Sequence, residues 1–429
     1  MRTLSNGQML RFYIPLMLQT VSQCLTYPLV AMVTVRGPLG SDAMAAFAQG
    51  QTVMFILGTL GFGLVTTGMV FARGRQGFNH FFKLNLIIGA VIVGLQITAS
   101  LPPFDRLIFG GILNMSGELY DAARETLLLC VPSHFFFVLR TPYQVALYNI
   151  RDSARANWAS MGRVAATALL SYVWCKLFPN AGGIRAAVLV FSVPIILEVI
   201  VSRMFAIRTI RNLPESTESC SIREQFWFNL PLTLGGFLLS VSALIIAAFI
   251  GRTGNAEQMK AIHFMVIGIV NPLAFSGLRI QTVTLSFLTS HGAAFGGKIL
   301  RFGALVGVVL CGVVLLLQIP ALSQWYFGEV QLLPPESVKM AMFAALCLAP
   351  LPLLQAFRSH AEGVAAWQKR PRLILAGQIA FIAALFCSLV VMRELKTPGY
   401  LMGAIAISVA VIATQLTIRT GLLLPRKNM

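Results

Sequence analysis

The chain has 429 residues, of which 57% are hydrophobic and 11% are charged, and its mean hydropathy is +0.77. Soluble globular proteins typically carry about 25% charged residues, so this composition excludes a soluble domain and predicts an integral membrane protein. The formal net charge is +18. Most of the Lys and Arg residues fall in short loops between apolar segments, which is typical of membrane topology and does not indicate nucleic-acid binding.

Apolar runs long enough to cross a bilayer as helices recur along the chain. The sequence lacks the alternation with a period of two residues that a transmembrane barrel needs. We therefore predict an all-α polytopic membrane protein with twelve transmembrane helices, at 10–35, 46–71, 84–103, 125–148, 157–178, 186–207, 227–250, 261–288, 299–320, 338–358, 372–392 and 398–420.

The first segment carries a polar stripe. Gln19, Gln23 and Thr26 are spaced at i, i+4 and i+7, which places them on one face of a helix. Pro15 and Pro28 each remove a backbone donor, which leaves carbonyl groups open to other partners. Two interpretations stay open: the stripe lines a cavity, or its amides hold a neighbouring helix.

The two halves of the chain resemble each other. Pro15 and Pro231 open the first and seventh segments in similar contexts. Pro132 and Pro350 recur at nearly the same offset along the chain, and each of these two precedes an arginine by eight residues. An even number of helices per half keeps both halves in one orientation, so the repeat is parallel. We predict an N-terminal six-helix bundle at 1–207, a cytoplasmic linker at 208–226 and a C-terminal six-helix bundle at 227–429.

The two repeated arginines, Arg140 and Arg358, lie within apolar segments, where a cation is costly and usually faces a cavity or a partner. A guanidinium group suits a carboxylate or a phosphate because its donors form a planar fork. The duplicated pair therefore indicates an anionic substrate bound from both halves. Alternatively, each arginine reaches a helix end or satisfies a neighbour's carbonyl groups. Glu362 follows Arg358 by four residues, so these two side chains can pair on one helix face.

Two further charges lie deep in apolar segments. Arg279, in the eighth segment, is a candidate third cation of the same site. Glu198, in the sixth segment, is the obvious deep carboxylate for Arg279 to pair with. A structural pair between Glu198 and an arginine and a role of Glu198 in proton or ion coupling are both open interpretations.

No motif typical of an enzyme occurs in the sequence. The five histidines show no metal-ligand spacing, the seven cysteines form no C-x-x-C pair, and G-x-S-x-G and H-E-x-x-H patterns are absent. We therefore predict no enzymatic activity, no cofactor and no metal site.

Lys and Arg concentrate in the loops that share a side with the two termini, whereas the opposite loops hold most of the acidic residues. By the positive-inside rule, we expect an integral protein of the plasma (inner) membrane with both termini in the cytoplasm.

Two six-helix halves, each opening on a proline-bearing helix, resemble the multidrug/oligosaccharidyl-lipid/polysaccharide (MOP) exporter superfamily. That group includes the MATE multidrug antiporters, polysaccharide and lipid-precursor flippases, and the progressive ankylosis protein. The stretch Arg358-Ser-His360-Ala-Glu362-Gly363, with the basic loop at Lys369 and Arg370, is similar to the arginine–small–histidine–x–x–glycine pattern of the ankylosis family. The resemblance implies a MATE-like fold with two bundles around a central cleft, alternating access and an anionic substrate.

The chain departs from cation-coupled MATE proteins in its first helix. Those proteins commonly carry an acidic residue there, whereas this segment has Gln19 and Gln23 and no Asp or Glu. The departure argues against proton or sodium coupling at that position. It also argues against a cationic drug as substrate, because the buried arginines would repel it.

Together these observations predict an alternating-access exporter of an organic or phosphate-bearing anion, functional as a monomer in the lipid bilayer and without a nucleic-acid partner. The alternatives are a flippase for a lipid-linked precursor or polysaccharide, a MATE-type multidrug antiporter, and a membrane scaffold or receptor that transports nothing. The candidate substrate-binding residues are Arg140, Arg358, Arg279, Gln19, Gln23, His360 and Glu362, and Glu198 is the candidate for proton or ion coupling.

Overall fold

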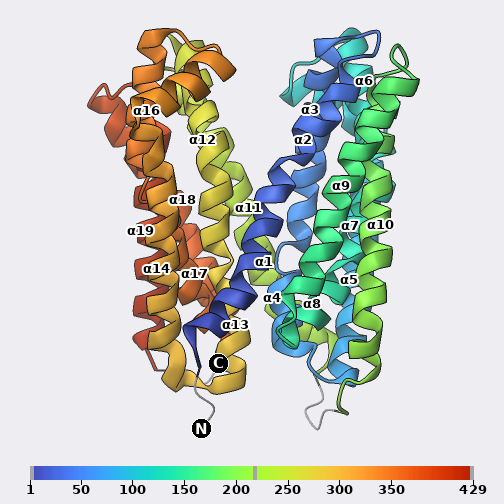
Figure 1. The fold of residues 1–429 in the computed structure, drawn as a ribbon, viewed down its shortest axis with the longest axis vertical. Helices are drawn as coiled ribbons and strands as arrows, with labels where there is room; N and C mark the ends of the chain where they lie inside the picture. Colours follow the sequence, from blue (N-terminus) through green and yellow to red (C-terminus); the bar gives the residue numbers. More distant parts are fainter. Residues whose placement is uncertain (1–3, 216–219, 426–429) are drawn as a thin grey trace. The chain divides into compact units, whose positions relative to one another are not determined.

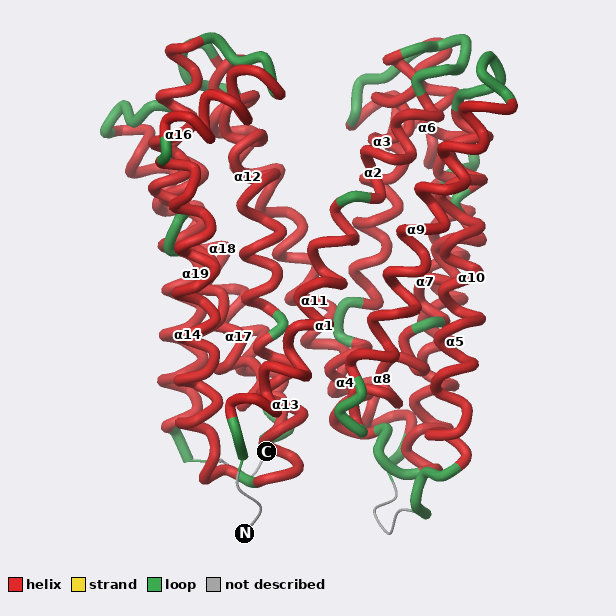
Figure 2. The backbone as a smooth tube through the Cα atoms, in the orientation of Figure 1, coloured by secondary structure: helices red, strands yellow, loops and turns green. Residues whose placement is uncertain are grey.

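The computed structural model describes residues 4–215 and 220–425. Helices cover most of this backbone, and it contains no strand within the described ranges (Figure 2). By packing, the helices form an N-terminal unit, Val21–Thr233, and a C-terminal unit, Met1–Thr20 with Leu234–Met429. Two helices contribute to both units, α1 (Asn6–Cys24) and α11 (Ile222–Ile250).

The other elements of the N-terminal unit are α2 (Thr26–Thr34), α3 (Ser41–Gly58), η1 (Thr59–Gly61), α4 (Leu64–Phe71), α5 (Arg75–Ala99), η2 (Arg106–Ile112), α6 (Gly117–Leu129), α7 (Val131–Leu139), α8 (Thr141–Asn149), α9 (Ser153–Leu177) and α10 (Ile184–Arg211). Those of the C-terminal unit are α12 (Ala256–Leu278), α13 (Ile280–His291), η3 (Ala293–Phe295), α14 (Gly296–Leu315), η4 (Leu316–Gln318), α15 (Pro320–Ser323), η5 (Gln324–Val330), α16 (Pro335–Leu348), α17 (Leu351–Trp367), α18 (Pro371–Glu394) and α19 (Gly399–Leu423).

The linker expected at 208–226 is helical at both ends, because α10 runs to Arg211 and α11 begins at Ile222. Packing groups the chain differently from the expected division. The first part of α1 packs with the C-terminal unit, and the first part of α11 packs with the N-terminal unit. The division of the chain into folding domains at 208–226 stays a prediction.

The expected all-α membrane fold is confirmed. Eleven helical stretches in the described part of the chain are long and apolar enough to cross a membrane. The segment expected at 157–178 corresponds to α9, which spans 25 residues but is not among the eleven. Polar residues lower the hydropathy of α9. Its buried polar side chains are Ser153, Asn157, Ser160, Arg163, Thr167 and Ser171.

The internal repeat is visible in the backbone. The two π-helices, η2 and η5, each have 7 residues, and the offset between their first residues equals the offset between Arg140 and Arg358. Residues with left-handed backbone pair at the same offset: Asn114 (φ 51°) with Leu332 (φ 56°), and Arg151 (φ 62°) with Lys369 (φ 55°). Non-glycine residues rarely adopt this conformation, so its recurrence at one offset supports a duplicated chain.

Each unit has its own apolar core. Phe47, Phe109 and Phe191 are buried in the N-terminal core, and Phe327 and Phe381 are buried in the C-terminal core. In the N-terminal unit α10 packs against α2, α7, α8 and α9, and in the C-terminal unit α17 packs against α12, α13, α14 and α19 (Figure 1). Helices α10 and α17 are therefore central to their units. Five of the buried charges lie on or beside them: Arg140, Arg163, Glu198, Arg358 and Glu362.

Candidate functional site

Arg140 lies at the break between α7 and α8. Pro142 has no backbone N–H, so it cannot donate to the carbonyl group of Val138, four residues earlier. The Val138 oxygen accepts instead from a backbone N–H at the C-cap of α7, and Asn85 on α5 supplies a second donor, with its Nδ2 3.1 Å from that oxygen. The Arg140 side chain is buried, and its guanidinium carbon lies 3.7 Å from the centroid of the Phe137 ring, in cation–π contact.

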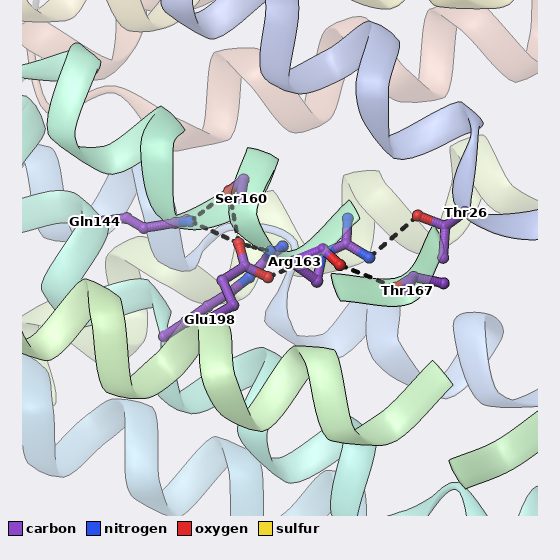
Figure 3. Close-up of polar contacts among 7 residues, drawn as sticks. Thr26, Gln144, Ser160, Arg163, Thr167 and Glu198 are labelled. Atoms are coloured by element: carbon purple, nitrogen blue, oxygen red, sulfur yellow. Dashed lines mark hydrogen bonds and ion pairs between the residues drawn. The ribbon is translucent and has the colours of Figure 1, made fainter. Parts of the chain in front are cut away.

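Glu198, on α10, is the carboxylate that meets Arg140. Its Oε1 accepts a hydrogen bond of 2.7 Å from Arg140 Nη1 and one of 2.6 Å from Ser160 Oγ. Gln144 Nε2 lies 3.5 Å from the same oxygen. Arg163 Nε, on α9, lies 3.0 Å from the other oxygen, Oε2. Figure 3 shows Gln144, Ser160 and Arg163 grouped around Glu198, so α8, α9 and α10 meet at one carboxylate.

Arg163 is the functional candidate that the sequence analysis missed. Its side chain is 4% exposed, and its Nη1 donates to Thr26 Oγ1 on α2 at 3.2 Å (Figure 3). Its Nε forms an ion pair with Glu198, but the geometry is not that of a hydrogen bond. The signal was present: Arg163 lies inside an apolar segment, as Arg140 does, with Ser160 and Thr167 on the same helix face.

We call Arg140, Gln144, Ser160, Arg163 and Glu198 the N-terminal cluster. It holds two guanidinium groups and one carboxylate, so its charge is positive by one elementary charge. All of its charged side chains are buried. A buried charge is costly unless it is paired and hydrogen-bonded, so an excess cation at this depth favours an anion as its partner.

Arg358 belongs to a second group, the C-terminal cluster, with Glu362, Gln378 and Phe381. The ion pair expected from the spacing of four residues is confirmed, since Arg358 Nε lies 2.8 Å from Glu362 Oε1. Gln378 bridges the pair: its Oε1 accepts from Arg358 Nη2 at 3.1 Å, and its Nε2 donates to Glu362 Oε1 at 2.9 Å. The ring centroid of Phe381 lies 5.6 Å from the guanidinium carbon of Arg358. This cluster is buried and its two charges cancel.

The other two candidates of the C-terminal half are Arg279 and His360. Arg279 lies at the break between α12 and α13, and its Nε donates to Thr20 Oγ1 at 2.7 Å. Glu198, the carboxylate expected for Arg279, contacts Arg140 and Arg163. Its pairing with Arg279 stays a prediction. His360 is buried, and its Nε2 lies 3.1 Å from the backbone oxygen of Gly296.

The polar stripe of the first segment is divided. Helix α1 ends at Cys24 and α2 begins at Thr26, so Gln19 and Gln23 lie on one helix and Thr26 on the next. Gln19 is buried and packs with the C-terminal unit, whereas Gln23 is half-buried and belongs with Thr26 to the N-terminal unit. Within residues 4–215 and 220–425, no group of three or more His, Cys, Asp or Glu side chains is placed to hold a metal ion.

No protein-family model matches the sequence, and no curated protein matches it. Solved structures do match. A proline-to-alanine mutant of a MATE protein is 16% identical with a TM-score of 0.78, covering 97% of this chain and 95% of that one. An outward-facing multidrug resistance MATE family transporter of the MOP superfamily is 18% identical with a TM-score of 0.76, covering 97% and 94%.

A third solved structure is a MOP superfamily transporter from Pyrococcus furiosus, described by a reverse polarity of its binding pocket that suggests a different function. It is 16% identical with a TM-score of 0.72, and the match covers 97% of this chain and 94% of that one. These likenesses span nearly the whole chain at low identity, which is evidence of a shared fold. The chain is thus an integral membrane protein with the fold of the MATE transporters of the MOP superfamily.

Proposed function

We propose that the chain is an alternating-access membrane transporter that exports an organic or phosphate-bearing anion. The observation that carries this proposal is the N-terminal cluster, in which buried Arg140 and Arg163 share the single carboxylate of Glu198. The fold supports transport, because proteins of this fold include MATE transporters. We further propose that the protein acts as a monomer in the plasma (inner) membrane with both termini in the cytoplasm.

The chemistry of the cluster supports an anion in particular. Charge interactions strengthen in a low-dielectric interior, so one uncompensated guanidinium group there attracts an anion more strongly than a surface arginine does. The planar fork of a guanidinium group matches the oxygen geometry of carboxylates and phosphates. A cation entering the same place would meet repulsion as well as desolvation.

A MATE-type multidrug antiporter is the second candidate. It is favoured by the match to a multidrug resistance MATE family transporter. The excess positive charge beside Glu198 weighs against a cationic drug. The Pyrococcus furiosus transporter, with its reverse polarity of the binding pocket, offers a precedent for a changed charge within this fold.

The test is flux through the purified full-length protein in proteoliposomes. Citrate, inorganic pyrophosphate and a nucleotide represent the anions, ethidium represents cationic drugs, and a fluorescent lipid-linked phosphate represents a flippase substrate. We expect anion flux that falls at least tenfold in Arg140→Gln. Arg185→Gln is the matched control, because Arg185 on α10 is exposed and pairs with Glu125 at the surface. Ethidium flux without anion flux would favour the multidrug antiporter, and lipid scrambling alone would favour a flippase.

A further inference from the structure

We infer that only one of the two duplicated arginine clusters binds the anion, and that Gln144 and Arg163 make the N-terminal cluster that site. The inference rests on the proposed function, and it places the binding of a carboxylate or phosphate group in one unit. Arg358, although repeated from Arg140, then holds its own helix packing together and does not bind substrate.

The two clusters occupy equivalent positions of the internal repeat. At the offset that relates Arg140 to Arg358, the equivalent pairs are Gln144 with Glu362, Ser160 with Gln378, and Arg163 with Phe381. The same offset relates the π-helices and the left-handed residues described above, so the correspondence holds in the backbone. The duplicated arginine has therefore kept its place while its surroundings have changed in charge.

In the C-terminal cluster, the residues that differ from the N-terminal repeat neutralise the charge of Arg358 within the protein. Glu362 stands where the N-terminal repeat has the neutral amide Gln144, and it places a carboxylate 2.8 Å from Arg358 Nε. Gln378 bonds both members of the pair, and Phe381 contributes an aromatic face in place of a second cation. An external anion would have to displace Glu362, which is tethered one helical turn from its arginine.

In the N-terminal cluster, the residues at the equivalent positions leave several guanidinium N–H donors without a hydrogen bond to the protein. Each guanidinium group has five N–H donors. Within the described residues, Arg140 donates one side-chain hydrogen bond, to Glu198, and Arg163 donates one, to Thr26. Arg163 Nε and Glu198 Oε2 are both buried without a hydrogen bond. The guanidinium groups of Arg140 and Arg163 therefore have N–H donors available, and the cluster carries one excess positive charge. Both properties suit a ligand with a carboxylate or phosphate group.

Reciprocal exchange of the equivalent residues tests the inference. Gln144→Glu adds the second carboxylate that neutralises the N-terminal cluster, and Glu362→Gln removes the carboxylate that neutralises the C-terminal one. Citrate and inorganic phosphate, titrated calorimetrically into the delipidated full-length protein in detergent, are the probes. We expect one site per chain in the unaltered protein, an affinity at least about 30-fold weaker in Gln144→Glu, and a second site in Glu362→Gln.

Arg163→Phe, which installs the equivalent residue of the other repeat, is the second variant. It keeps the ion pair of Arg140 and Glu198, so it answers the question if Gln144→Glu does not fold. Arg185→Gln should bind like the unaltered protein, because Arg185 is 86% exposed and lies outside both clusters. A parallel titration in nanodiscs of neutral or anionic lipid tests whether the bound group belongs to a free anion or to a lipid headgroup. If citrate and phosphate bind more weakly in anionic nanodiscs alone, the ligand is a headgroup phosphate.

The outcomes separate this inference from the proposed function. If the unaltered protein binds no anion and carries no anion flux, the proposed function fails. If it binds an anion but both Gln144→Glu and Arg163→Phe bind equally well, the location is wrong while the function stands. Two anion-binding sites in the unaltered protein would overturn the claim that the C-terminal cluster does not bind the anion.

Discussion

The guanidinium Nε of Arg163 lies 3.0 Å from Oε2 of Glu198, while the other carboxylate oxygen is bonded by Arg140 and Ser160. One buried carboxylate thus holds two cations, Arg163 on α9 and Arg140 at the break between α7 and α8. Such a group has two roles at once: it stabilises the fold of the N-terminal unit, and it competes with any anion that approaches the same arginines.

Glu198→Gln should destabilise the protein by about 3–5 kcal/mol, because it leaves two buried cations without a carboxylate. Unfolding of the purified protein in detergent measures this loss. Added citrate should raise the melting temperature of the variant more than that of the unaltered protein, since the ligand replaces the lost charge. Glu125→Gln, at the exposed pair with Arg185, is the control and should change stability little. An unchanged melting temperature in Glu198→Gln would refute the prediction.

Arg358→Gln should cost more stability than Arg358→Gln combined with Glu362→Gln. The single variant leaves Glu362 buried without its cation, whereas the double variant leaves amides that can bond one another. We expect the second change to restore more than half of the loss, in a double-mutant cycle measured by unfolding in detergent. Additive losses would show that the two side chains do not interact.

Asn85 should be coupled to Pro142 through the carbonyl group of Val138. Asn85→Ala removes the side-chain donor to that oxygen, which keeps its bond from a backbone N–H at the C-cap of α7, and should cost about 0.5–1.5 kcal/mol. In a Pro142→Ala background the cost should shrink, because alanine at 142 restores a backbone N–H that can reach Val138. The same unfolding assay measures both backgrounds, and an equal cost in each would exclude this coupling.

Gly50 on α3 should not tolerate a methyl group. A Cβ there would lie 2.6 Å from the backbone oxygen of Ala123 on α6, so the two helices would have to separate. We expect Gly50→Ala to cost about 1–3 kcal/mol. Gly94 on α5 is the matched control: nothing lies within 4 Å of a methyl group placed there, and Gly94→Ala should be neutral or stabilise by up to about 1 kcal/mol. Equal effects of the two substitutions would contradict the close contact of α3 and α6.

The orientation proposed from the charge of the loops is tested with reporters fused to the C-terminus. A fluorescent protein that matures only in the cytoplasm should be bright, and alkaline phosphatase, which is active only outside, should be inactive. The reverse pattern would place the termini on the other side and exchange import for export in the proposed function.

The sequence by itself determined the class of the protein and its repeat. Helix length and hydropathy are local properties, so the apolar segments predicted the membrane helices, and the proline and arginine spacings predicted the duplication. The pair of Arg358 and Glu362 followed for the same reason, because a spacing of four residues brings two side chains together on any helix.

Only the tertiary structure decided which charges meet across helices. Glu198 is 58 residues from Arg140 and 38 from Ser160, and no helical periodicity relates residues so far apart. The packing of α8, α9 and α10 selected Arg163 as the second cation beside Glu198. The excess charge of the N-terminal cluster is therefore a property of packing, since it depends on how many cations the fold places around one buried carboxylate.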